Sequence, residues 1–162
     1  MRVAALALFA AASLQAQAAP APQAPTLISP AGTKDVLSSA MLASLPSVTL
    51  RTSFGTDHGP MTAVFQGPLL WTILVHEGAV VPAHPRDAAR QVLLVTGQDG
   101  YSAVLALGEI APPFEGKQAI LADSMNGRPL GAGHWRLVIP DEHRGGRDVR
   151  DVVRLQLLAP HP

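Results

Sequence analysis

Cysteine is absent from this chain of 162 residues. Its absence excludes disulfide bonds, thiolate ligands for metals and catalysis by a cysteine nucleophile. Charged side chains make up only 15% of the residues, and 12 basic side chains balance 12 acidic ones. A chain without net charge produces no general attraction to nucleic acid or to anionic lipid. We therefore expect no nucleic-acid partner.

Long apolar runs are also absent, apart from a short run at the start of the chain. Residues 3–15 are uncharged and follow a single Arg2, and Ala16-Gln17-Ala18 fits the small-x-small pattern of a cleavage site. This layout is typical of a secretory signal peptide, and the run is shorter than the roughly 20 residues that cross a bilayer. We predict a signal peptide over residues 1–18, a periplasmic or secreted protein, and no membrane span after cleavage. A buried N-terminal helix or a membrane anchor is the alternative.

Proline is concentrated directly after this segment, with four prolines in residues 19–30. Proline fixes φ and lacks an amide donor, which favours an extended tether. We assign residues 19–44 to a Pro/Ala-rich linker with a short helical turn near its end. Residues 45–158 form the predicted folded domain and residues 159–162 a tail. The length suits one domain, and the apolar fraction of 48% excludes a disordered chain.

Alternation of apolar and polar side chains predicts that most of the domain is β-structure. The predicted strands are 48–54, 61–66, 91–96, 101–105, 118–122, 135–139 and 152–158. Turn residues between the first two strands and at Gly97-Gln98-Asp99-Gly100 predict two hairpins. A helix is predicted to start at Pro68 and to end at Gly78, and 107–110 is predicted to be one helical turn. The sum is an α+β, strand-rich domain with one clear helix.

Arginine is concentrated near the carboxyl end. Six of the ten arginines lie between Asn126 and Arg154, together with four acidic residues. The centre of this segment, residues 144–150, reads RGGRDVR. Glycines allow a backbone to approach a ligand closely, and guanidinium groups pair with two phosphate oxygens at once. The segment therefore predicts a site for an anionic small molecule. The alternative is a solvated loop whose arginines pair with the neighbouring acids.

Other catalytic and metal-binding patterns are missing. The six histidines show neither HxH nor HExxH spacing, so no metal site is predicted. Ser53, Asp57 and His58 lie close together in the sequence, but no GxSxG elbow is present. No P-loop occurs, and no residue is assigned as catalytic.

The order of several motifs resembles the oxidoreductase molybdopterin-binding domain of sulfite-oxidase-like proteins. The motifs are FQGPLLWTIL, VTGQDGYSAVLALGEI, MNGRPL, WRLVIP and GGRDVRDVVRLQL. Together they cover about residues 48–158. The resemblance implies the mixed-sheet sulfite-oxidase fold. The family's R-x-x-x-P pattern matches Arg136 and Pro140, and its G-x-[KR]-x-V-K loop, which helps to hold the pterin phosphate, matches Gly145, Arg147, Val149 and Arg150.

What the resemblance implies for the site is a pocket for a pterin phosphate or a similar anion. The residues assigned to this pocket are Asn126 at the rim, His58 at the mouth, and Arg136, Arg144, Gly145, Gly146, Arg147 and Arg150 along the wall. Molybdopterin is thus the cofactor that the resemblance implies.

Two departures from the family concern the metal. The family's molybdenum-ligating cysteine corresponds to about residues 53–55, where Ser53, Phe54 and Gly55 offer no thiolate. A serine hydroxyl does not replace a soft thiolate. The family's histidine before the arginine is also displaced, since His134 lies two residues before Arg136. We therefore do not expect the usual cysteine-ligated molybdenum centre, and no dimerisation domain is expected after Leu158.

Three functions remain open from the sequence. The first is an exported member of this family that binds a pterin phosphate or similar anion without the usual molybdenum centre. The second is a cofactor-free periplasmic binding or accessory module that engages a protein partner on the same scaffold. The third is an oxidoreductase with a molybdenum site that lacks a thiolate. The sequence patterns favour neither an enzyme nor a binding protein.

Overall fold

The computed structural model describes residues 23–159. The predicted signal peptide, residues 1–18, lies outside this range, as do the first residues of the predicted linker and residues 160–162 of the predicted tail. Within the described range, no helix has the length and apolar character that crossing a membrane requires.

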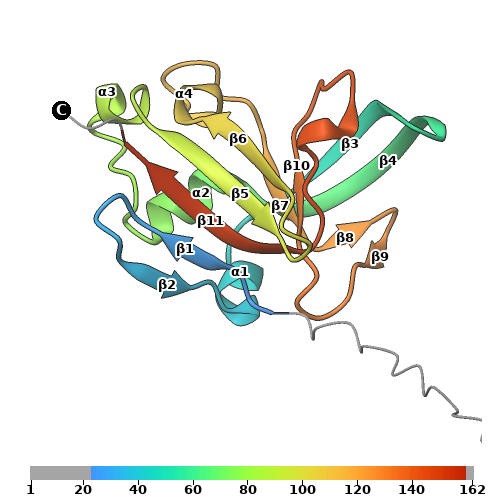
Figure 1. Ribbon diagram of the computed structural model, residues 1–162, viewed down its shortest axis with the longest axis horizontal. Coiled ribbons are helices and arrows are strands. Elements are labelled where there is room, and N and C mark those ends of the chain that lie inside the picture. Colours follow the sequence, from blue (N-terminus) through green and yellow to red (C-terminus); the bar gives the residue numbers. More distant parts are fainter. Residues whose placement is uncertain (1–22, 160–162) are drawn as a thin grey trace, which may run out of the picture.

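A five-stranded sheet forms one half of the fold (Figure 1). Its strands are β1 (Thr26–Ile28), β2 (Lys34–Val36), β5 (Val92–Gly97), β6 (Ser102–Ala106) and β11 (Val152–Leu158). Their order is β2-β1-β11-β5-β6. β1 runs parallel to β11 and all other neighbours are antiparallel, so the sheet is mixed.

The other half is built around a long hairpin. β3 (Ser47–Thr56) and β4 (Gly59–Pro68) pair along ten residues each, from Ser47 opposite Pro68 to Thr56 opposite Gly59. The short strands β8 (Ser124–Met125) and β9 (Arg128–Pro129) extend this sheet in the order β3-β4-β8-β9. A separate ribbon pairs β7 (Ile120–Ala122) with β10 (Arg136–Val138).

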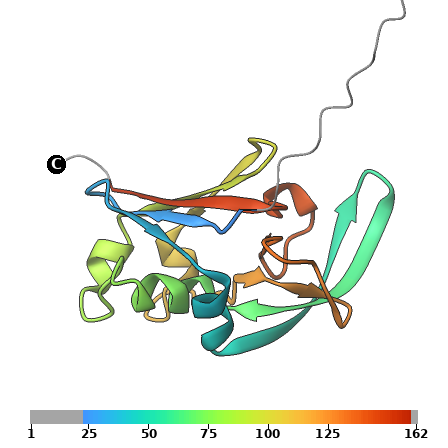
Figure 2. The same ribbon diagram turned by 90° about the horizontal axis from the view of Figure 1, so that it is seen from below.

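The helices are short. They are α1 (Ser39–Ser44), α2 (Leu70–His76), α3 (Pro85–Ala88), α4 (Leu107–Ile110) and the 3₁₀ turn η1 (Gly145–Arg147). The first three lie against one face of the five-stranded sheet, while no helix of the described residues lies on its opposite face (Figure 2). α1 is capped by Ser38, whose hydroxyl accepts a hydrogen bond of 3.1 Å from the Met41 amide, as polar N-cap residues do.

Two hydrophobic cores meet at the β7–β10 ribbon. The main core lies between the five-stranded sheet and the helices, and the second core lies under the β3–β4 hairpin. Because successive side chains of a strand point to opposite faces, Leu121 and Leu137 enter the main core while Ile120 and Val138 enter the second. Arg136 shares the face of Val138, and its side chain therefore points toward the second core.

Gly67 lets β4 cross this ribbon at close range. A Cβ atom at this position would lie 2.2 Å from the carbonyl oxygen of Leu121, so only glycine fits. Pro68, predicted as the first residue of a helix, instead ends β4, and the helix begins at Leu70. The close approach of two strands could not be recognised in the local sequence.

The fold class predicted from the sequence is confirmed. The protein is a strand-rich α+β domain with mixed sheet pairing, and α2 is its longest helix. Both predicted hairpins form, and β11 spans the predicted residues 152–158.

The linker prediction is corrected between residues 26 and 44. This segment contributes β1, β2 and α1, and Leu27, Leu37 and Leu42 are buried in the main core. The physical reason is that β1 is stabilised by its pairing with the central strand β11. A strand of three residues is too short to show a period-two pattern in the sequence. The folded domain therefore begins near residue 26 and not at residue 45.

Replacement of Leu27 by alanine tests this boundary. The side chain is 1% exposed, so we expect the variant to lose about 2–5 kcal/mol of unfolding free energy, as buried leucines do. Val36→Ala on the adjacent strand is the control, since Val36 is 68% exposed, and we expect a change within about 0.5 kcal/mol. Urea unfolding followed by circular dichroism measures both. Equal midpoints for wild type and Leu27→Ala would contradict the assignment of residues 26–28 to the core.

Candidate functional site

The predicted anion-binding segment lies in the loop between β10 and β11, residues 139–151, which we call the arginine loop. It carries η1 at its centre, and η1 contacts both β6 and β3. The loop thus bridges the five-stranded sheet and the long hairpin. On the hairpin side, the Gly55 amide donates a hydrogen bond of 3.0 Å to the carbonyl of His143.

Arg136 forms a bidentate ion pair with Asp148 of this loop. Its Nε lies 2.6 Å from Asp148 Oδ1 and its Nη2 lies 2.7 Å from Oδ2. Both side chains are almost fully buried, at 10% and 8% exposure. The guanidinium carbon also lies 5.1 Å from the centre of the Phe65 ring and 6.0 Å from that of Phe54, distances at which a cation is attracted to an aromatic ring. The carboxylate of Asp148 therefore neutralises this arginine inside the fold.

Arg147 is held by two other carboxylates. Its guanidinium donates hydrogen bonds to Glu142 of the same loop and to Glu109 of α4, the latter at 3.2 and 3.3 Å. The hydrogen bond to Glu142 and the negative charges of Glu109 and Glu142 raise the pKa of Arg147 above its ordinary value. Nη1 also lies 3.4 Å from the carbonyl of Val104 on the edge strand β6. This arginine fastens the loop to the five-stranded sheet.

The glycines of the loop pack against the protein as well. A Cβ atom on Gly145 would lie 2.8 Å from the Phe54 ring, so the ring occupies the space beside the loop backbone. The hydroxyl of Tyr101 donates a hydrogen bond to the carbonyl of Gly146. The loop is therefore attached to its surroundings by ion pairs, backbone hydrogen bonds and an aromatic contact.

Arg144 and Arg150 differ from the two paired arginines. Both are exposed, and neither forms an ion pair with a carboxylate within residues 23–159. The structure therefore divides the four predicted arginines into two that are neutralised internally and two that face solvent.

Asn126 and His58 lie on two hairpin turns that are not part of the arginine loop. Asn126 has φ of 53° and precedes Gly127, with φ of 73°, in the turn between β8 and β9. Its Oδ1 accepts a hydrogen bond of 2.9 Å from the Val64 amide. His58 is exposed at the tip of the β3–β4 hairpin. The sequence had assigned both residues to the rim and mouth of one pocket.

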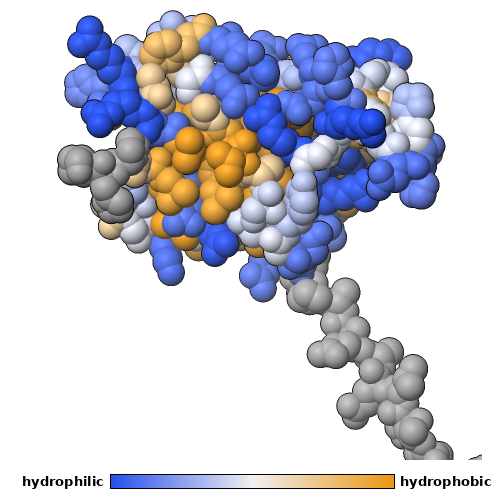
Figure 3. Space-filling model, turned by 45° about the horizontal axis from the view of Figure 1, so that its top comes forward, coloured by the Kyte–Doolittle hydropathy of each residue, from blue (hydrophilic) through white to orange (hydrophobic). Residues whose placement is uncertain are grey.

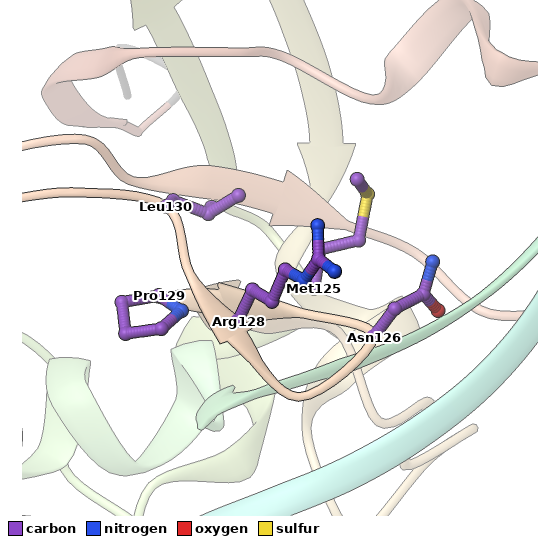
Figure 4. Close-up of a pocket in the computed structure, with 5 residues that line it drawn as sticks. All are labelled: Met125, Asn126, Arg128, Pro129 and Leu130. Atoms are coloured by element: carbon purple, nitrogen blue, oxygen red, sulfur yellow. The ribbon is translucent and has the colours of Figure 1, made fainter.

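Asn126 lines a different hollow, of about 350 Å³ (Figure 4). Its other lining residues are Met125, Arg128, Pro129 and Leu130. Arg128 was part of the NGRPL motif but was not predicted to bind a ligand. Only the folding of this motif into a tight hairpin brings its side chain to the hollow.

A second hollow, of about 320 Å³, lies between α1 and residues 131–135. His134 lines it, and its Nδ1 lies 2.7 Å from Asp151 Oδ1. Sequence spacing gave no indication of this pair, because 17 residues separate its members. Within the described residues, no group of three metal-binding side chains forms.

Comparison with known proteins gives a relationship at the level of the fold. No protein-family model matches the chain, and no curated protein matches it. Among solved structures, the sulfane dehydrogenase SoxCD from Paracoccus pantotrophus superposes with a TM-score of 0.64 at 17% sequence identity. The match covers 84% of this chain and 38% of that chain. At this identity the likeness shows a distant common fold and does not carry an activity.

The residues present do not fit a molybdopterin in the manner that the resemblance implied. The chain has no cysteine for molybdenum. Asp148, Glu109 and Glu142 already neutralise Arg136 and Arg147, and the Phe54 ring fills the space next to Gly145. A phosphate in this place would have to displace the buried carboxylate of Asp148 or the half-buried carboxylates of Glu109 and Glu142, and a displaced buried carboxylate would be an uncompensated charge.

Removal of the charge of Asp148 tests the buried ion pair. Asp148→Asn leaves Arg136 without a counterion among aromatic rings, and we expect a loss of about 3–5 kcal/mol of unfolding free energy. Arg150→Ala, an exposed arginine in the same loop, is the control and should change stability by less than about 0.5 kcal/mol. Urea unfolding at neutral pH measures both, and equal losses in the two variants would contradict a special role for the pair.

Proposed function

We propose that this chain is an exported, cofactor-independent binding domain that attaches to another protein through the open face of its five-stranded sheet. The scaffold is the one that it shares with part of a sulfane dehydrogenase. The chain spans 38% of that protein's length, so the dehydrogenase activity in that protein's name is not assigned to this chain.

The observation that carries this proposal is an apolar sheet surface that no helix of residues 23–159 covers. Alternate residues of the five strands point away from the helices, and we call this surface the outer face. Its apolar residues are Ile28, Val36, Val92, Leu94, Val104 and Leu158. Val36, Val104 and Leu158 are 68%, 49% and 40% exposed, and an apolar area is visible on the molecular surface in Figure 3.

An apolar sheet face without a covering layer is uncommon. A sheet normally buries its hydrophobic face against a second layer, and here helices cover only the inner face. Leu94 lies opposite Val104, and Val92 lies opposite Leu158, so these four side chains form a continuous surface, which Gln156 separates from Ile28. Contiguous exposed apolar patches of this kind mark protein interaction sites.

Charges on the outer face favour a different protein over a second copy. Lys34 and Arg154 lie on the outer face, because Lys34 is opposite Ile28 and Arg154 is opposite Thr26. The outward-pointing residues of the five strands include no acidic residue. Two copies packed face to face would bring like charges together, which is unfavourable. We therefore assign the surface to a protein partner with an apolar patch bordered by acidic side chains.

The second candidate function is the binding of a pterin phosphate or similar anion, as the resemblance implies. Arg144 and Arg150 favour it, because both are exposed and lack carboxylate partners within the described residues. Such an anion would bind at the outside of the arginine loop and not in the space filled by Phe54.

Cofactor content separates the two candidates. We purify the protein from cells that synthesise molybdopterin, and measure molybdenum by mass spectrometry and oxidised pterin by fluorescence. A sulfite-oxidase-type enzyme purified from the same cells is the reference. We expect less than about one tenth of a pterin per chain, because carboxylates neutralise Arg136 and Arg147, two of the arginines that the resemblance assigns to the pterin phosphate. One pterin per chain that disappears in an Arg144→Ala, Arg150→Ala double variant would support the second candidate and contradict the first.

Site-specific photo-cross-linking tests the outer face. A cross-linking amino acid is placed at Val104, or at the exposed Arg51 of β3 as the control, and the protein is exported in its own cells. We expect one protein to be linked from Val104 and not from Arg51. This protein is then purified, and its affinity for the wild-type chain should fall at least tenfold for Val104→Asp. Equal cross-linking from both positions would contradict the proposal. A dimer of this chain that Val104→Asp dissociates, measured by light scattering, would replace the proposed partner with a second copy.

A further inference from the structure

The hollow beside the β8–β9 hairpin is lined by an exposed arginine and an asparagine whose roles neither the fold nor the proposed partner surface explains. We infer that this hollow binds a small dianionic oxyanion of the phosphate or sulfate type. The site belongs to the four-stranded sheet, whereas the outer face belongs to the five-stranded sheet. Its test is therefore independent of the proposed protein partner.

The electrostatics of the hollow favour an anion. Among its five lining residues, Arg128 carries the only charged side chain. Arg128 is exposed and forms no ion pair with a carboxylate in the part of the chain that the structure describes. Figure 4 shows its side chain extending from the hairpin toward Met125. An arginine that is not neutralised offers a planar fork of donors, the arrangement that pairs with two oxygens of a phosphate.

Asn126 supplies a second donor. Its side-chain Oδ1 accepts a hydrogen bond of 2.9 Å from the backbone amide of Val64, and its backbone amide donates one of 2.7 Å to the Val64 carbonyl. These two bonds fix the turn against β4. The bond to Oδ1 also fixes the orientation of the side-chain amide, and it leaves the Nδ2 group, which is a donor only, available to a ligand.

A third donor lies behind Met125. Asp148 occupies Nε and Nη2 of Arg136, which leaves Nη1 with the Met125 sulfur at 4.0 Å. A thioether is a weak acceptor, so this buried nitrogen is poorly satisfied. Met125 contacts Arg136 on one side and lines the hollow on the other. Because a methionine side chain adapts its shape easily, its rotation would let a bound oxyanion reach Arg136 Nη1.

The size of the hollow fits this ligand class. About 350 Å³ accommodates one tetrahedral oxyanion and several waters, each of which takes about 30 Å³ in the liquid. The same oxyanion chemistry is present in free inorganic phosphate or sulfate and in a phosphate monoester. The opening of the hollow at the exposed hairpin admits both, so the experiment compares them.

Titration by nuclear magnetic resonance tests the site in the whole folded protein. Sodium phosphate, sodium sulfate and glycerol phosphate are added in turn at constant ionic strength, against sodium chloride. We expect saturable shifts of the backbone amides of Met125, Gly127 and Arg128, with at least a tenfold loss of affinity in Arg128→Ala. The matched control is Arg90→Ala, another exposed arginine, which lies between α3 and β5, and its affinity should stay within twofold of wild type.

The outcomes separate the parts of the inference. Saturation by glycerol phosphate alone identifies a phosphate monoester as the ligand, and equal saturation by the inorganic ions identifies the free oxyanion. A change in affinity of threefold or more in Met125→Ala supports the contact with Arg136, and an unchanged affinity contradicts that contact. Shifts that rise linearly with every salt, equally in wild type and in Arg128→Ala, would overturn the site.

Discussion

The buried ion pair between Arg136 and Asp148 fixes how the two halves of the domain meet. Arg136 lies on β10, whose neighbours Leu137 and Val138 enter different cores. Its guanidinium therefore lies between the β3–β4 hairpin and the arginine loop. It contacts the rings of Phe54 and Phe65 on the hairpin and the carboxylate of Asp148 on the loop. A charge in such a place is tolerated only when it is paired with an opposite charge. Asp148 thus determines where the loop runs, and Val149 next to it is buried in the main core.

The need of a guanidinium group inside the fold for a counterion explains why Arg136 and Arg147 bind carboxylates here, although the resemblance assigns them to a phosphate. An arginine fork recognises a carboxylate and a phosphate by the same bidentate geometry. Glu109, Glu142 and Asp148 occupy Arg147 and Arg136, so a ligand at these positions would compete with internal partners that are already in place. Exposed arginines without such partners remain available. Arg144 and Arg150 of the loop are exposed as well, but Arg128 on the β8–β9 hairpin also lines a hollow together with Asn126, and this favours the hairpin as the anion site.

Local sequence patterns predicted the longer strands but not the contacts between them. Val153, Leu155 and Leu157 alternate regularly, and the last strand has the predicted bounds. β1 was missed because its three residues lie among prolines and become a strand only by pairing with β11. Composition described the arginine loop equally well as an anion site and as a loop with internal ion pairs. Asp148 and Glu142 are close enough in sequence to suggest pairing, but Glu109 lies 38 residues from Arg147, and no spacing rule connects them.

The attachment of the arginine loop also bears on the outer face of the sheet. β11 is the central strand, and it begins directly after the loop, where Gln98 donates a hydrogen bond of 2.8 Å to the Asp151 carbonyl. Its inward residues Leu155 and Leu157 pack in the main core, while Arg154 and Leu158 belong to the outer face. A strand fixed at its start and along its inner side presents its outer side chains in one arrangement. Since the ordering of flexible side chains and loops opposes association, this rigidity favours recognition of a protein surface, whereas binding of a phosphate inside the loop would first require its ion pairs to break.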